Sequence, residues 1–364
     1  MTQDLFKSGG PYNVKKVGHE KYSMSISLPA DEHGRIAREC LDENCSPGYY
    51  KVKNGTGITE GHEKAFCPYC GTSGEPNDFS TKEQIRYAKE IVMREAEQAI
   101  EDMIGNTLGL GSSGKKKIGG GLLSIEMSLK KTPRRHVYRP FEEDLLRILV
   151  CPKCGLNHAV FGIAVWCPDC GSDIFMEHVA AEYEVVRTML SDVERRRETL
   201  GPRIAARDLE NCLEDVVTIF ETVLKAMLRR HLFSCGHTEE EINGLFKDRF
   251  RNGLQNPRRA EEIIRNRMGQ ELFSEVVPEK VEQLWGTFEK RHPITHNLGV
   301  VDRKYLEKAY ANEREGREVT VSREEIEIAI SVCMKVLGKL HSSVFQPHTT
   351  EEYTDGQELK PVMD

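Results

Sequence analysis

The chain has 364 residues, of which 38% are hydrophobic and 30% are charged, and its formal net charge is −7. This length allows two or three domains, and the composition is typical of a soluble protein rather than a membrane protein, because no run approaches the roughly 20 apolar residues of a spanning helix. A negative net charge excludes a general attraction to nucleic acid, so any such binding must depend on local basic patches. The N-terminus has no secretory signal pattern, and we expect a cytoplasmic protein.

Residues 1–20 are expected to form a flexible arm that precedes a small α+β unit. Apolar and polar residues alternate over Tyr22–Leu28 and again over Leu122–Leu129, which is the period of a strand with one buried face. Between them, an apolar stripe of helical period predicts a helix at about Thr81–Ile104. Because neither strand would be stable alone, we expect both in one sheet with this helix packed on it, in a unit at residues 21–135.

This unit contains the first of two cysteine sets. Cys67-Pro-Tyr-Cys70-Gly is a knuckle in which two residues separate the cysteines, and a more widely spaced pair lies upstream. In a cytosolic chain, paired cysteines indicate a metal site rather than disulfides. We therefore predict that the first zinc ion is held by Cys40, Cys45, Cys67 and Cys70.

The second set forms two tightly spaced knuckles, Cys151-Pro-Lys-Cys154-Gly and Cys167-Pro-Asp-Cys170-Gly. Four thiolates close a tetrahedral site and leave no position for water, so this zinc ribbon, at residues 141–176, is predicted to be structural rather than catalytic. The glycine after each knuckle permits the positive φ that the turn requires. Between the knuckles, 159–161 and 163–165 are expected to pair as a short hairpin. Iron of the rubredoxin kind is the alternative to zinc, because it uses the same ligands.

From residue 177 to 345 the pattern predicts an all-helical domain, followed by a flexible polar tail at 346–364. The first two helices are expected at about Glu177–Thr199 and Ile204–Leu232. Local signals mark where three later helices begin: Asn256-Pro257 as N-cap and first residue, Pro278, and a capping box formed by Ser322 and Glu325.

The candidate catalytic residues are Arg291, His292 and His296, which follow an amphipathic helix. Pro293 disfavours helix at His292, so we expect a bend that lets these side chains converge. Arginine supplies a cationic fork for a phosphate, and histidine moves protons near neutral pH. Metal-free RNA cleavage needs these functions: a base for the 2′-hydroxyl, an acid for the leaving oxygen and positive charge at phosphorus. The alternative is a helix-end cluster that only complements the macrodipole.

The stretch Arg291-His292-x3-His296, with its flanks Phe288 and Asn297-Leu-Gly-Val-Val-Asp302, resembles the HEPN superfamily over about residues 178–345. The resemblance implies an all-α bundle. It also implies a metal-independent endoribonuclease that acts as a homodimer, as toxins and antiviral defence effectors of the superfamily do. Other members do not cleave RNA and serve as binding or assembly modules. The superfamily often places an acidic residue on an earlier helix beside the motif, and Glu214 and Glu221 are the candidates here.

The sequence therefore predicts a multidomain protein with small β-rich zinc-ribbon units followed by an all-α HEPN-like bundle. The expected function is endoribonuclease activity that yields a 2′,3′-cyclic phosphate, with two structural zinc ions and with ribbons that recognise RNA or a trigger. The alternatives are a non-catalytic adaptor and a nucleic-acid-binding regulator. Expected partners are RNA and a second copy of the chain, bound through the helical domain. No membrane is expected, and an antitoxin or trigger is left unassigned.

Overall fold

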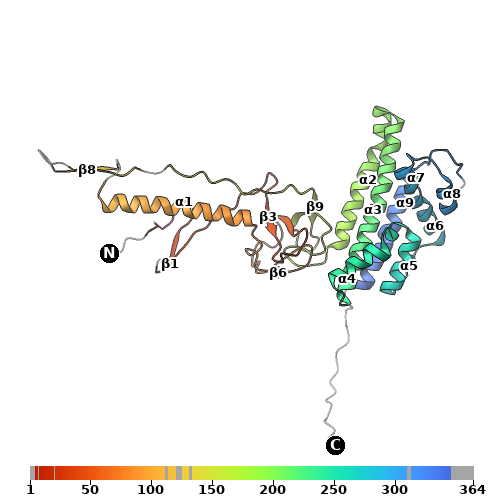
Figure 1. The fold of residues 1–364 in the computed structure, drawn as a ribbon, viewed down its shortest axis with the longest axis horizontal. Helices are drawn as coiled ribbons and strands as arrows, with labels where there is room; N and C mark the ends of the chain where they lie inside the picture. Colours follow the sequence, from red (N-terminus) through yellow and green to blue (C-terminus); the bar gives the residue numbers. More distant parts are fainter. Residues whose placement is uncertain are drawn as a thin grey trace, which may run out of the picture. The chain divides into compact units, whose positions relative to one another are not determined.

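The computed structural model describes residues 5–6, 8–19, 21–110, 114–119, 125–130, 133–309 and 313–345. The chain divides into two compact units, Met1–Phe175 and Met176–Asp364. The first, here called the N-terminal unit, holds small antiparallel sheets and one long helix, whereas the second, the helical unit, is almost entirely α-helical (Figure 1). This agrees with the predicted order of β-rich ribbons followed by helices.

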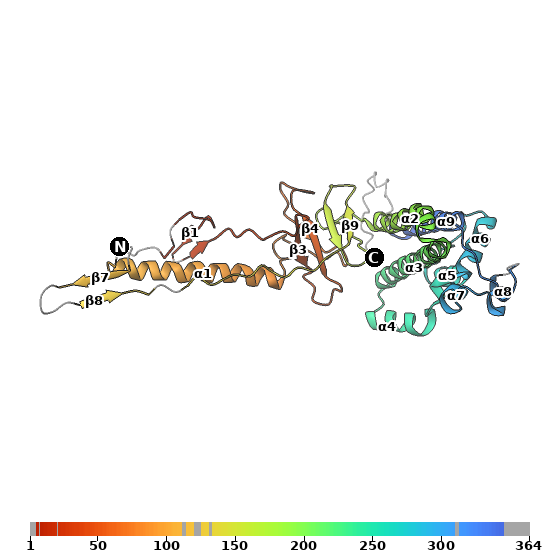
Figure 2. The same cartoon turned by 90° about the horizontal axis from the view of Figure 1, so that it is seen from above.

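The central sheet of the N-terminal unit combines strands from both cysteine regions. Its order is β3-β4-β10-β9, and every neighbouring pair is antiparallel. Figure 2 shows these strands gathered at one end of the long helix α1. The strands are β3 Arg35–Glu39, β4 Tyr49–Lys53, β9 Arg147–Val150 and β10 Asn157–Val160. The two ribbons, predicted as separate segments, thus share one sheet.

The hairpin predicted between the two knuckles of the second ribbon is wrong. Strand β10 pairs on one side with β9, which precedes Cys151, and on the other side with β4. Residues 163–165 form no strand. The reason is that the backbone N–H groups of Val165 and Trp166 both donate to the carbonyl oxygen of Pro68, in the other ribbon.

The single sheet predicted for Tyr22–Leu28 and Leu122–Leu129 is also wrong. The first segment contributes β2 Lys21–Ser23, which pairs with β1 Lys15–Gly18, a strand inside the expected N-terminal arm. The second contributes β8 Ile125–Ser128, which pairs with β7 Lys115–Ile118. Each strand thus finds a partner close in sequence, where the entropy cost of closing the loop is small. Leu122, Leu123 and Ser124 lie outside the described residues.

The predicted helix of this unit is present as α1, Lys82–Thr107, but it does not pack on a sheet as expected. Thr81 is its N-cap and forms a capping box with Gln84. Gln84 also donates to the carbonyl oxygen of Ala37 on β3, which ties the first turn of α1 to the central sheet. Among the described residues of α1 only Gln84 and Ile91 are buried. The apolar stripe is otherwise exposed in part, at Ile85, Val92, Met93, Ile100 and Ile104. A fourth, two-stranded sheet joins β5 Ala65–Phe66 to β6 Ser73–Gly74.

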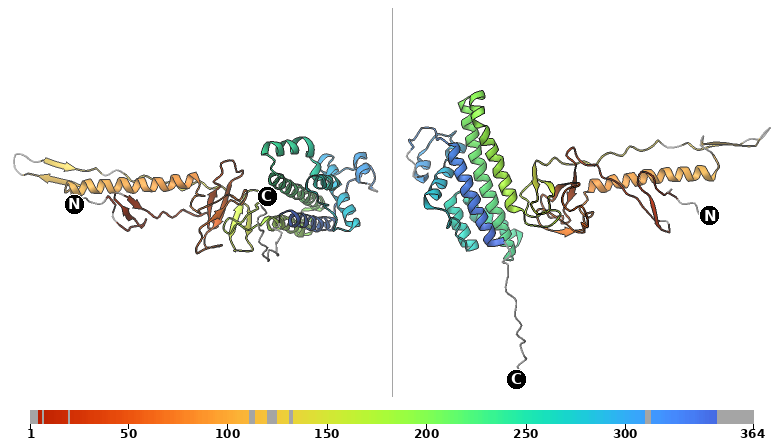
Figure 3. Two further views of the ribbon diagram at one scale, coloured as in Figure 1. Left: turned by 90° about the horizontal axis from the view of Figure 1, so that it is seen from below. Right: turned by 180° about the vertical axis from the view of Figure 1, so that it is seen from behind.

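The helical unit is built around α3, α9 and α2, which run side by side (Figure 3). The predicted start signals are confirmed, since Asn256 caps α5 and Ser322 with Glu325 caps α9. Cys212 and Cys333 are fully buried in these helices, as core residues. The helices are α2 Phe175–Leu200, α3 Pro202–Ser234, α4 Glu239–Gly244, α5 Pro257–Met268, α6 Pro278–Glu289, α7 Arg291–His296, α8 Arg303–Ala309 and α9 Arg323–Phe345, with a π-helical turn at Leu245–Phe250 and a 3₁₀ turn at Gly253–Gln255.

Among the described residues, α9 is the one helix long and apolar enough, by length and composition, to cross a membrane. Its apolar face is used inside the helical unit, where Ile330, Cys333 and Leu337 are buried. The core helix of a globular domain meets the same length and composition criteria. The apolar character of α9 is therefore explained by packing against α3 and α6.

Candidate functional site

The first cysteine set converges as predicted, and its four sulfur atoms lie within 4.8 Å of one another. The Sγ atoms of Cys40 and Cys70 are 3.5 Å apart, and those of Cys45 and Cys67 are 3.8 Å apart. Sulfur atoms bound to one tetrahedral zinc ion at about 2.3 Å are separated by about 3.8 Å. The four thiols thus have the spacing that a single zinc ion needs.

The second set has the same geometry. The Sγ atoms of Cys151 and Cys170 are 3.7 Å apart, and those of Cys154 and Cys167 are 3.5 Å apart. All four again lie within 4.8 Å of one another. Four protein ligands fill a tetrahedral coordination sphere, so each set can hold one ion in a structural role and offers no open position to a substrate.

Three of the four turns that present these cysteines repeat one pattern of backbone hydrogen bonds. In the turn at Cys67, the Cys67 N–H donates to the carbonyl oxygen of Thr72, and the Gly71 N–H donates to that of Cys67. The turns at Cys151 and Cys167 make the same pair of bonds. The wider pair, Cys40 and Cys45, instead closes through Gly48, whose carbonyl oxygen accepts from the Cys40 N–H.

The pKa values of the thiols differ within each set: hydrogen bonds outweigh the effect of burial at Cys70 and Cys151 and lower their pKa values, to about 7 for Cys151. Burial, together with the neighbouring thiols, raises the pKa of Cys45 to about 12 and that of Cys154 to about 11. Burial also places the pKa values of Cys67 and Cys167 well above the usual range. A divalent cation offsets this penalty, because thiolate is the form that binds it, so metal binding must release protons.

The two ribbons interlock through reciprocal contacts that the sequence did not reveal. The Phe66 N–H donates to the carbonyl oxygen of Pro168 at 2.8 Å, and the Trp166 N–H donates to that of Pro68 at 3.1 Å. Gly71 packs against the Trp166 ring and Gly171 against the Phe66 ring. Each contact occurs twice with the roles exchanged, and β4 and β10 lie antiparallel between the ribbons. The ribbons are therefore related by an approximate two-fold axis and form one block.

The predicted catalytic residues lie on α7, Arg291–His296, in the helical unit. The expected departure from helix at His292 is wrong: the break falls at Lys290, and the backbone is helical from Arg291 onward. Pro293 is accommodated because it is only the third residue of α7, where backbone N–H groups have no partner within the helix. Lys290 is held at this break by Glu325 and by the carbonyl oxygen of Thr320.

The structure brings the two histidines together. The ring centroids of His292 and His296 are 5.1 Å apart, one helical turn along α7. The His292 Nε2 lies 3.7 Å from a carboxylate oxygen of Asp302. Asp302 is itself fixed, because it accepts hydrogen bonds from the Asn297 side chain and the Tyr305 N–H. Partial burial, with the positive charge of Lys304, lowers the pKa of His292 below its usual value, whereas Asp302 acts in the opposite direction.

The Arg291 side chain binds a residue outside α7. Its Nη1 donates to the Gln255 side chain at 2.7 Å, and its Nε is buried without a hydrogen-bond partner among the described residues. The two acidic candidates are now distinguished. Glu214 on α3 accepts a hydrogen bond from Thr295, within α7, whereas Glu221 is buried and pairs with Lys225 of its own helix. Of these two candidates, Glu214 is the one that contacts α7.

Comparison with known proteins adds no relative: no family model matches the chain, and no curated protein or solved structure matches it. Function must therefore be inferred from the chain's own residues and their geometry.

Proposed function

We propose that this protein is a cytoplasmic, metal-independent endoribonuclease of the HEPN type, whose paired zinc ribbons position RNA. The observation that carries the proposal is the contact between His292 and His296 on α7. These histidines belong to Arg291-His292-x3-His296, the stretch that resembles the HEPN motif. His296 is exposed, and His292 is only partly buried, so both rings are available to a substrate.

The chemistry assigns one proton transfer to each histidine. His292, whose pKa is lowered, is mainly neutral at pH 7 and serves as the base that removes the 2′-hydroxyl proton. His296 gives a proton to the leaving 5′-oxygen. Attack of the 2′-oxygen on phosphorus then yields a 2′,3′-cyclic phosphate and a 5′-hydroxyl. Arg291 supplies positive charge near the scissile phosphate, and Asp302 keeps the His292 ring in place.

The resemblance also supports a homodimer through the helical unit. A two-fold interface brings two copies of α7 together, so His292 of one copy and His296 of the other could act as base and acid on opposite sides of the phosphate. Such an arrangement suits a toxin or a defence effector, whose activity depends on assembly. In this proposal the zinc ions are structural and take no part in the cleavage step.

The test is cleavage of single-stranded RNA by the full-length, zinc-loaded protein in magnesium-free buffer with EDTA. His296→Ala is expected to lower the rate by about 10²–10⁴-fold, the range that a positioned acid–base group contributes. His237→Ala is the matched control, because His237 lies in the same unit but contacts Glu241 at the start of α4. Zinc content is measured after incubation. Equal rates for wild type and His296→Ala, at full zinc occupancy, would refute the proposal.

A non-catalytic adaptor is the second candidate, and one contact favours it. Arg291 is held by Gln255 rather than directed at the histidine pair, as a residue with a purely structural role would be. On this reading α7 only completes the packing of the helical unit, and the ribbon block is a binding platform. A protein that is folded and zinc-loaded, and that dimerises without cutting any RNA tested, would support the adaptor.

A further inference from the structure

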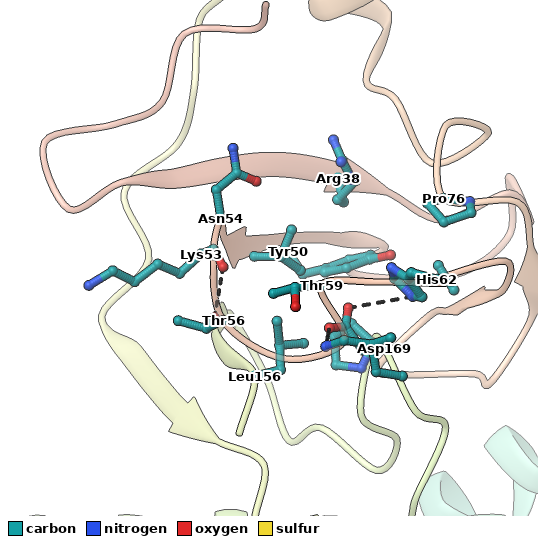
Figure 4. Close-up of a pocket in the computed structure, with 15 residues that line it drawn as sticks. Arg38, Tyr50, Lys53, Asn54, Thr56, Thr59, His62, Pro76, Leu156 and Asp169 are labelled. Carbon is teal, nitrogen blue, oxygen red and sulfur yellow. Dashed lines mark hydrogen bonds and ion pairs between the residues drawn. The ribbon is translucent and has the colours of Figure 1, made fainter. Parts of the chain in front are cut away.

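A polar cleft of about 360 Å³ lies in the N-terminal unit, between the two ribbons (Figure 4). One ribbon lines it with Arg38 and Tyr50 of the sheet and with the loop that carries His62. The other ribbon contributes Leu156 and Asp169. The cleft is distinct from the zinc centres, whose thiols do not line it, and from α7, which belongs to the other unit.

Comparison of the two ribbons about their approximate two-fold axis shows that a larger side chain can fill the position where this cleft lies. Asp169 is the third residue of its knuckle, Cys-Pro-Asp-Cys, and Tyr69 holds the same position in Cys-Pro-Tyr-Cys. The Tyr69 hydroxyl donates to the carbonyl oxygen of Tyr49 at 2.8 Å and accepts from the Phe161 N–H at 3.0 Å, so the tyrosine ties the ribbons together at that position. At the related position the shorter Asp169 leaves open space.

The surrounding loop is built onto the Asp169 carboxylate. The Asp169 side chain is only 8% exposed, and its Oδ2 accepts a hydrogen bond from the Ile58 N–H at 3.0 Å. A Cβ at Gly57 would lie 2.0 Å from the same oxygen, so only glycine lets the loop approach this closely. The carboxylate is thus held in a fixed position at the floor of the cleft.

One polar neighbour of this carboxylate forms an ion pair with it but makes no hydrogen bond. His62 Nε2 lies 3.7 Å from Asp169 Oδ1, which is too far for a hydrogen bond, and this nitrogen is buried without a hydrogen-bond partner among the described residues. Figure 4 shows the two side chains pointing toward one another beside the ring of Tyr50. The ion pair leaves the buried His62 nitrogen without a hydrogen bond, and such nitrogens are usually hydrogen-bonded, which points to a ligand that completes the site.

We propose that this cleft binds a guanine base, as a free nucleotide or as a guanosine in single-stranded RNA. A carboxylate only accepts hydrogen bonds. On its Watson–Crick edge guanine offers two adjacent N–H donors, whereas adenine, cytosine and uracil place an acceptor beside the donor. Unpaired bases in RNA are recognised on this edge. Arg38 and Lys53 line the cleft with positive charge for a phosphate, and Leu156 supplies an apolar surface for the ring.

The inference deepens the proposed function, and it rests on that function only for the RNA source of the base. Substrate choice would then lie in the ribbons, whereas the cleavage chemistry lies on α7. The cleft would select guanosine-containing RNA, and the sequence-independent contacts to the backbone would come from basic side chains such as Lys53.

The test measures binding of GMP and AMP to the full-length, zinc-loaded protein by calorimetry. The guanine nucleotide is expected to bind at least about tenfold more tightly, the discrimination of one bidentate contact. Asp169→Asn should abolish this preference, because the amide replaces an acceptor with a donor. Asp144→Asn is the matched control, since Asp144 is exposed and does not line the cleft. Equal binding of GMP and AMP by the wild type would overturn the inference, as would a preference that survives Asp169→Asn.

Short oligonucleotides that differ only by guanosine or adenosine at one position identify the source of the base, with His296→Ala protein used to prevent cleavage. If the Asp169→Asn protein loses zinc, Arg38→Gln is used as the test variant instead. At full zinc content this variant is expected to bind GMP several-fold more weakly than the wild type. Unchanged affinity would contradict the inference. If the protein cleaves RNA without a preference for guanine, the guanine-binding proposal is refuted and the ribonuclease proposal is not. Guanine binding without cleavage refutes only the ribonuclease proposal.

Discussion

At the residue scale, the glycine that follows a knuckle has a different role in different turns. Gly155 and Gly171 both have positive φ, of 77° and 64°. A Cβ on Gly155 would meet no atom within 4 Å, whereas one on Gly171 would lie 2.8 Å from the Phe66 ring. Gly155 is thus required only by its backbone conformation, and Gly171 also by the contact between the ribbons.

This pair gives an internally controlled prediction. Gly155→Ala should be mildly destabilising, because an alanine at positive φ costs about 1 kcal/mol. Gly171→Ala should cost about 1–3 kcal/mol more, because the methyl group must displace a packed aromatic ring. The measurement is the denaturant midpoint of zinc release for the two variants. Equal midpoints would contradict the reciprocal packing of the ribbons.

A second residue-scale prediction concerns the charge state of His292. Its pKa lies below the usual value of about 6.5, because partial burial and Lys304 disfavour the imidazolium form. Asp302 favours that form, so Asp302→Asn should lower the pKa further, and His292 should then stay neutral to a lower pH. Histidine NMR titration measures both midpoints, with His237 as an unaffected reference. A higher midpoint in the variant would show that Asp302 does not face His292 in solution.

At the element scale, the features that the sequence predicted well were those set by local chemistry. The helix starts at Asn256 and Ser322 followed from side chains that satisfy N–H groups a few residues away. The thiol clusters followed from the spacing of cysteines within turns. Partners distant in sequence were not predictable in this way. The pairing of β4 with β10 joins segments more than 100 residues apart, and no local signal marks it.

The same distinction applies to the candidate sites. Arg291, His292 and His296 could be found because they share one short segment, but which acidic residue accompanies them could not. Glu214 and Glu221 lie two turns apart on nearly the same face of α3, and only the contact with Thr295 separates them. The cleft was missed because His62 and Asp169 come from different ribbons and form no motif.

At the scale of the whole molecule, the described structure separates two tasks. The N-terminal unit contains both four-cysteine sets, each of which could hold a metal ion, and the cleft, and the helical unit contains the histidine pair. Within the N-terminal unit the two four-cysteine sets are not independent. The Phe66 N–H, adjacent to Cys67 of the first site, donates to Pro168, between Cys167 and Cys170 of the second. A disturbance of the turn in one set must therefore reach the turn in the other.

This coupling leads to a prediction about metal content. The wild-type chain should contain two zinc ions, one for each set of four cysteines, as measured by elemental analysis. Cys167→Ser removes one ligand of the second site. If the ribbons were independent, the variant would keep one tightly bound ion. Because the turn at Cys167 supports the turn at Cys67, we expect instead fewer than one ion per chain and faster loss of the remaining zinc to a chelator.

Two further variants separate this coupling from general damage. Cys235→Ser is the control, because Cys235 is exposed and lies in the helical unit, so it should keep two ions. Cys67→Ser is the reciprocal change, and an approximate two-fold relation requires it to weaken the second site in the same way. Retention of one full, chelator-resistant ion in both Cys167→Ser and Cys67→Ser would mean that each ribbon folds around its own metal. The shared sheet would then be a consequence of two stable ribbons rather than a condition for them.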